Sequence, residues 1–107
     1  MAKHYKMYLG GKWIDSEAKL AVHSPYDNTL IATCAIATQK NYIDAISIAE
    51  KSFALTRELP SYKREETCLA IADGLEKNLD KFARMLSLEV GKVHRDSVGE
   101  VKRAIGV

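Results

Sequence analysis

Residues 38–53 read TQKNYIDAISIAEKSF, and this stretch marks the point where the chain changes from strands to helices. Its apolar side chains recur at intervals of four, three and four residues, at Tyr42, Ile46, Ala49 and Phe53. Such spacing places them along one face of an α-helix. Thr38 stands where a hydroxyl can accept a hydrogen bond from an amide of the first turn, so we expect it to be the N-cap.

Before this helix the sequence favours short antiparallel strands. Within residues 6–14, the pair Gly10-Gly11 tolerates the positive φ of a tight hairpin. A strand over residues 20–22 is expected to enter a turn, because Pro25 fixes φ and Asn28 accepts the left-handed conformation. Residues 30–37 are apolar and partly β-branched, which predicts a further strand.

Two further helices are predicted after the break at residues 59–61. The first carries an apolar stripe of Cys68, Ile71 or Ala72, Leu75 and Leu79. The next is expected to be capped by Asp80 and to end at Gly91 in the left-handed conformation, with an apolar face of Phe82, Met85, Leu86 and Val90.

The last segment predicts a fourth helix with apolar positions at Val101 and Ile105. Ser97 and Glu100 stand at the spacing of a capping box, which would start the helix at that point. A longer helix that begins nearer His94 is an open alternative.

The expected fold class is therefore α+β, with strands and a hairpin over residues 1–37 and a helical segment over residues 38–107. The chain stops directly behind a helical pattern, and we favour a truncation. We expect the apolar stripes of at least two helices to lack a complete partner within this chain, leaving exposed hydrophobic patches.

Composition excludes several classes of protein. The 107 residues are 47% hydrophobic and 28% charged, as in an ordinary globular protein rather than a disordered one. A formal charge of +2 is too small to predict a nucleic-acid or membrane partner. Neither a signal-peptide-like start nor a membrane span is apparent, so we expect a cytoplasmic protein.

Few side chains stand at the spacing that is typical of a catalytic or metal-binding site. We expect Cys34 and Cys68 to be reduced and mostly buried thiols, and neither is a candidate nucleophile. The three histidines, His4, His23 and His94, are scattered without a metal-ligand partner.

Two charged residues and the glycines also have structural explanations. Lys92 is expected to meet the dipole of a helix C-terminus, and Glu100 to serve in the capping box. The glycines never form Gly-x-Gly-x-x-Gly after a strand, so no phosphate-binding turn is predicted.

The order of short motifs resembles the opening of NAD(P)-dependent aldehyde dehydrogenases. In the turn motif, Ser24 replaces the usual Asn and Asn28 stands where Gly is common, and both changes preserve the turn chemistry. The matching segments are YLGGKW (8–13), SPYDNTLIA (24–32), residues 44–53, LPSYKR (59–64), LAIADGLE (69–76), EVGK (89–92) and EV (100–101).

The resemblance implies a function for a longer enzyme rather than for these residues alone. Such enzymes oxidise an aldehyde to a carboxylic acid, or in some branches to a thioester, through a cysteine thiolate and a glutamate, with NAD or NADP as hydride acceptor. In the family these residues and the dinucleotide site lie downstream of residue 107. The resemblance therefore implies an inactive, incomplete N-terminal part of a Rossmann-like cofactor-binding domain, with no catalytic, cofactor-binding or metal residue and no bound cofactor.

Its implied partners are the remainder of the same enzyme, a small aldehyde for the full-length enzyme, and further copies in a homo-oligomer. Some family members place an acid of a monovalent-cation site near the position of Glu100. The alternative hypothesis is a freestanding α+β module that binds a protein through one apolar stripe.

Overall fold

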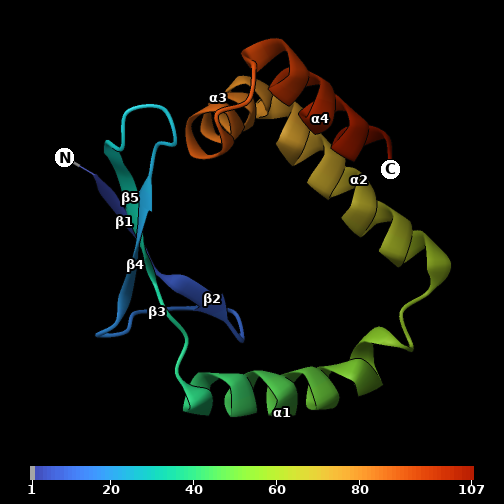
Figure 1. Cartoon of the computed structure of the whole chain (residues 1–107). Coiled ribbons are helices and arrows are strands. Elements are labelled where there is room, and N and C mark those ends of the chain that lie inside the picture. Colours follow the sequence, from blue (N-terminus) through green and yellow to red (C-terminus); the bar gives the residue numbers. More distant parts are fainter. Residues whose placement is uncertain (1) are drawn as a thin grey trace. The chain divides into compact units, whose positions relative to one another are not determined.

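The computed structural model describes residues 2–107, which form short strands followed by helices (Figure 1). None of the described helices is both long and apolar enough to cross a membrane. The α+β class is confirmed. The elements are β1 (Lys3–Tyr5), β2 (Met7–Leu9), β3 (Lys12–Ile14), β4 (Lys19–His23), β5 (Leu30–Ala35), α1 (Gln39–Thr56), α2 (Ser61–Lys77), α3 (Leu79–Val90) and α4 (His94–Gly106).

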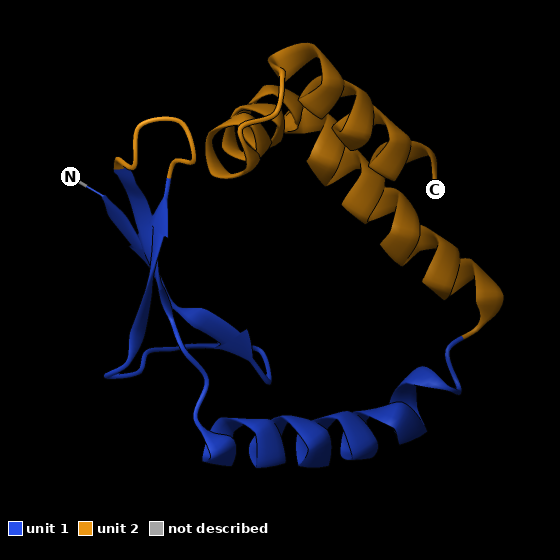
Figure 2. Ribbon diagram, viewed as in Figure 1, with its two compact units in different colours: residues 1–23, 30–59 blue, residues 24–29, 60–107 orange. Residues whose placement is uncertain are grey.

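The chain packs as two units (Figure 2). The first unit comprises residues 1–23 and 30–59, and so holds the strands and α1. The second unit comprises residues 24–29 and 60–107, and so holds the turn after β4 together with α2, α3 and α4.

The predicted hairpin is confirmed in the first unit. Strands β2 and β3 pair antiparallel, and the rings of Tyr8 and Trp13 lie across from each other with centroids 5.0 Å apart. Gly10 and Gly11 adopt φ of 57° and 78°, which side chains with a Cβ rarely accept. A Cβ on Gly10 would lie 2.7 Å from Cδ1 of Ile48 in α1, so the hairpin turn approaches α1 closely at this residue.

The three-stranded sheet has the order β1-β5-β4 and contains one strand that the sequence did not predict. β4 and β5 are antiparallel as expected, but β1 pairs with β5 in parallel. Its sequence, Lys-His-Tyr, has no apolar alternation. The His4 imidazole contributes side-chain contacts, since Nδ1 lies 2.9 Å from Oγ1 of Thr33 and Nε2 lies 2.9 Å from Oδ1 of Asp15.

Thr38 is the N-cap of α1, as predicted. Its hydroxyl accepts a hydrogen bond from the Asn41 amide, and Oδ1 of Asn41 accepts one from the Thr38 amide. The predicted apolar stripe is exposed: Tyr42, Ile46 and Phe53 keep 63%, 70% and 62% of their surface. No residue of α1 or α2 is buried within the described chain. The expected unpartnered apolar faces are therefore confirmed.

The second unit is held together where α3 crosses α4. Ala83 and Ser97 are fully buried and Val101 nearly so, and the hydroxyls of Ser87 and Ser97 lie 3.0 Å apart. Gly91 ends α3 in the left-handed conformation, with φ of 71°, as predicted. A Cβ on Gly91 would lie 3.1 Å from Cγ of Pro25, so the turn after β4 packs against this helix end.

One predicted helix start is wrong, and for the last helix the second of the two open alternatives is found. α3 begins at Leu79 after Asn78, and Asp80 lies in the first turn, where its carboxylate accepts a hydrogen bond from Arg84 at 2.7 Å. α4 begins at His94, so the longer-helix alternative holds and the capping box does not form. Ser97 cannot cap the helix because its hydroxyl is turned inward to Ser87.

The expected burial of the cysteines is also only partly met. Cys34 is half-buried in β5, as expected, but Cys68 is exposed on α2. All of residues 51–71 are exposed within this chain, so the predicted stripe position of Cys68 has nothing packed over it.

Two glycine substitutions should have opposite effects on the free energy of unfolding. Gly10→Ala is expected to destabilise the chain by about 1–2 kcal/mol, because of the positive φ and the approach to Ile48. Gly74→Ala meets no atom within 4 Å in α2 and should stabilise by about 0.5–1 kcal/mol. Urea denaturation followed by circular dichroism measures both. Equal effects of the two changes would contradict the close approach.

Candidate functional site

The short connection between α3 and α4 brings charged residues together in the second unit. Gly91 ends α3, and the Val93 carbonyl accepts hydrogen bonds from the Asp96 and Ser97 amides in the first turn of α4. The Ser97 hydroxyl contacts the Val93 carbonyl at 3.4 Å. These bonds fix the place of Lys92 relative to α4.

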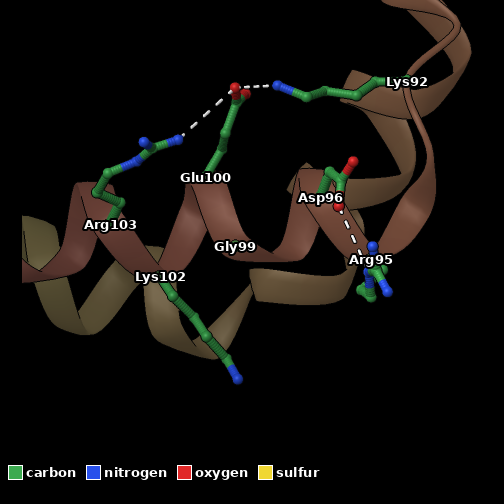
Figure 3. A pocket seen from close by; sticks show the side chains of 7 residues that line it. All are labelled: Lys92, Arg95, Asp96, Gly99, Glu100, Lys102 and Arg103. Carbon is green, nitrogen blue, oxygen red and sulfur yellow. Dashed lines mark hydrogen bonds and ion pairs between the residues drawn. The ribbon is translucent and has the colours of Figure 1, made fainter.

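Lys92 donates a hydrogen bond to Oε1 of Glu100 and forms an ion pair with it (Figure 3). Nη2 of Arg103 lies 3.9 Å from the same oxygen. The hydrogen bond from Lys92, followed by its positive charge, holds the pKa of the Glu100 carboxyl below its usual range. Glu100 therefore stays ionised to lower pH than an isolated glutamate.

A hollow of about 870 Å³ surrounds this ion pair. Four cationic side chains, those of Lys92, Arg95, Lys102 and Arg103, line it together with Asp96, Glu100 and Gly99. Nε of Arg95 is 3.5 Å from Asp96, whereas Lys102 extends away from Glu100 and has no ion-pair partner among residues 2–107 (Figure 3). The lining carries a net positive charge, which favours a negatively charged group over a cation.

The structure changes the explanation of the two charged residues singled out in the sequence. Lys92 was expected to act on a helix dipole; it directly follows Gly91 at the end of α3, and it also forms an ion pair with Glu100. Glu100 was explained by a capping box that does not form. Sequence reasoning missed Arg95, Lys102 and Arg103. Only the spacing of Arg95, Gly99 and Lys102, at four and three residues, gave a signal for them.

The other residues considered in the sequence lie apart from this hollow. His4 is in β1, His23 ends β4, and His94 begins α4 with Nε2 3.6 Å from Asp80. Across the described part of the chain, no three or more His, Cys, Asp or Glu residues are grouped as metal ligands. Gly74 and Gly99 lie within helices, and Gly106 is the last residue of α4.

The Lys92–Glu100 pair should make stability depend on pH. A lowered carboxyl pKa in the folded chain stabilises it above the ordinary carboxyl range, and this contribution is lost as pH falls through the lowered pKa. Lys92→Met should therefore reduce the free energy of unfolding near pH 7, and the difference from the unmodified chain should shrink toward about pH 3. Urea titrations at both pH values measure this. A difference of the same size at both would contradict the pair, and Arg84→Met, which breaks an exposed pair, is the control.

Comparison with known proteins identifies the family of this chain. The aldehyde dehydrogenase family model matches residues 13–107. Malonate-semialdehyde dehydrogenase 2 of Oceanobacillus iheyensis is 31% identical over 96% of this chain and 22% of its own length. The 3-sulfolactaldehyde dehydrogenase of Priestia aryabhattai is 34% identical over 95% of this chain and 21% of its own length.

Solved structures of the same family have the same fold as this chain. Aldehyde dehydrogenase 21 from Physcomitrella patens, in complex with the reaction product succinate, superposes with a TM-score of 0.95 at 29% identity, covering 99% of this chain and 22% of that one. Betaine aldehyde dehydrogenase from Staphylococcus aureus, in complex with NAD+, shares the fold with a TM-score of 0.85 at 24% identity, covering 91% and 20%.

The chain spans about a fifth of the length of the curated relatives that it matches. The family model nevertheless covers most of its residues, including the α3–α4 turn and the charged hollow. By sequence and by fold, the chain belongs to the aldehyde dehydrogenase family.

Proposed function

We propose that this chain is the N-terminal part of an NAD(P)-dependent aldehyde dehydrogenase that oxidises an aldehyde to a carboxylic acid. The observation that carries the proposal is the family match over residues 13–107, in a chain about a fifth as long as its relatives. The exposed stripe of α1 supports it, because a helix with no buried residue needs a further partner to be stable. The proposed partner is the remainder of the same enzyme.

We place the catalytic and cofactor-binding residues outside residues 1–107, which together form an incomplete part of the cofactor-binding domain. The position of the cysteines supports this, since Cys34 lies within β5 and Cys68 lies on the open face of α2. NAD or NADP is proposed for the longer enzyme and not for this chain. A cytoplasmic location and a homo-oligomeric state stay predictions from the sequence.

The proposed substrate is an aldehyde that carries an acidic group. The names of two relatives support it, since malonate semialdehyde and 3-sulfolactaldehyde bear a carboxylate and a sulfonate. On this chain, the support is the net positive lining of the hollow around Glu100. Arg103 is the proposed anchor, because its guanidinium is only at the edge of ion-pair distance from Glu100, at 3.9 Å.

A chimeric enzyme tests the family function. Residues 1–107 should replace the corresponding segment of malonate-semialdehyde dehydrogenase 2 of Oceanobacillus iheyensis with retention of NAD-dependent oxidation of malonate semialdehyde. The 107-residue chain alone should show no turnover. A chimera that folds like its parent, by circular dichroism and gel filtration, but has no activity would contradict the proposal and favour a separate interaction module.

The same chimera tests the acidic substrate. Arg103→Gln should raise KM for malonate semialdehyde roughly tenfold, which corresponds to the loss of about 1.4 kcal/mol of binding. The KM for propanal, which has no acidic group, should change little. Arg84→Gln, on the exposed surface of α3, is the matched control. Equal changes in KM for both aldehydes would remove Arg103 from substrate recognition.

A further inference from the structure

A second hollow lies in the first unit, where the hairpin of β2 and β3 approaches α1. Its volume is about 320 Å³, at the small end of ligand pockets. Leu9, Ile14 and Ile48 give it an apolar lining. Gly10 also lines the hollow, at the point where the hairpin turn approaches Ile48 of α1.

The charged groups of this hollow are positive in sum. Lys12 and Lys51 line it, and neither has an ion-pair partner among residues 2–107. The one carboxylate in the lining, that of Asp44, is engaged by Lys40 at 2.6 Å. The half-buried Ser47 adds a hydroxyl that is able to donate a hydrogen bond.

We propose that this hollow binds a small carboxylic acid with a short apolar chain. The apolar chain would lie against Leu9, Ile14 and Ile48, and the carboxylate would accept hydrogen bonds from Lys12 and Lys51. An uncharged molecule would leave both ammonium groups without a partner, and an amine would be repelled by them.

Such acids are also the class of product that aldehyde oxidation makes. If the proposed function holds, the hollow is an effector site through which a product acts on the enzyme away from the reaction centre. The regulatory role rests on that function, whereas binding of the acid to this chain does not. The two are therefore tested separately.

The binding test is a titration of the chimeric enzyme with hexanoate, followed by the methyl resonances of Ile14 and Ile48 in heteronuclear NMR of the isoleucine-labelled protein. Saturable shifts with a Kd of the order of 1 mM are expected for a ligand of this size. The double substitution Lys12→Met with Lys51→Met should weaken binding at least tenfold. Lys77→Met, in the second unit, should leave it unchanged. Hexylamine, with the same apolar chain and the opposite charge, should give no saturable shift.

Three results would overturn the proposal: no saturation with hexanoate, equal shifts with hexylamine, or equal binding by the double variant. The hexylamine comparison needs no substitution and so does not depend on the folding of a variant. Loss of chimera activity alone would contradict the proposed function and leave the binding result standing.

Discussion

The scarcity of buried apolar surface is the constraint on which the rest of this structure depends. Among residues 2–107, the apolar side chains that are buried are Ala32, Ala83 and Val101. These are small or medium side chains, and burial of apolar area is the main favourable term in folding. The helices α1 and α2, which bury no residue within the described chain, therefore gain little of this stabilisation there.

Local sequence predicted the elements whose geometry is decided locally. The Gly10-Gly11 pair specifies its hairpin because positive φ excludes most other residues, and Gly91 ends α3 for the same reason. Thr38 caps α1 through its own neighbour Asn41. In each case the deciding contact spans a few residues, so a single sequence contains the information.

The wrong or missing predictions concern contacts between segments far apart in the chain. Strand β1 forms because its backbone pairs with β5. The side chains of residues 3–5 show no alternation of apolar and polar residues that would predict this pairing. Ser97 has the chemistry of a cap, but packing against Ser87 buries it in α4. In α4, Glu100 pairs with Lys92 and is not part of a capping box. The sequence therefore singled out two of the charged residues of the candidate site but gave Glu100 the wrong role. The cations on α4 near them had no local signal strong enough to be singled out.

The path of the chain through the turn after β4 limits how recombination can exchange the two units. Residues 24–29 belong to the second unit, although the strands on either side of them, β4 and β5, belong to the first. The polypeptide thus passes from one unit to the other at three places, so no single cut in the gene separates the two units cleanly. Recombination at one crossover point would divide a unit rather than exchange it. Exchange of one unit without any part of the other would need more than one crossover.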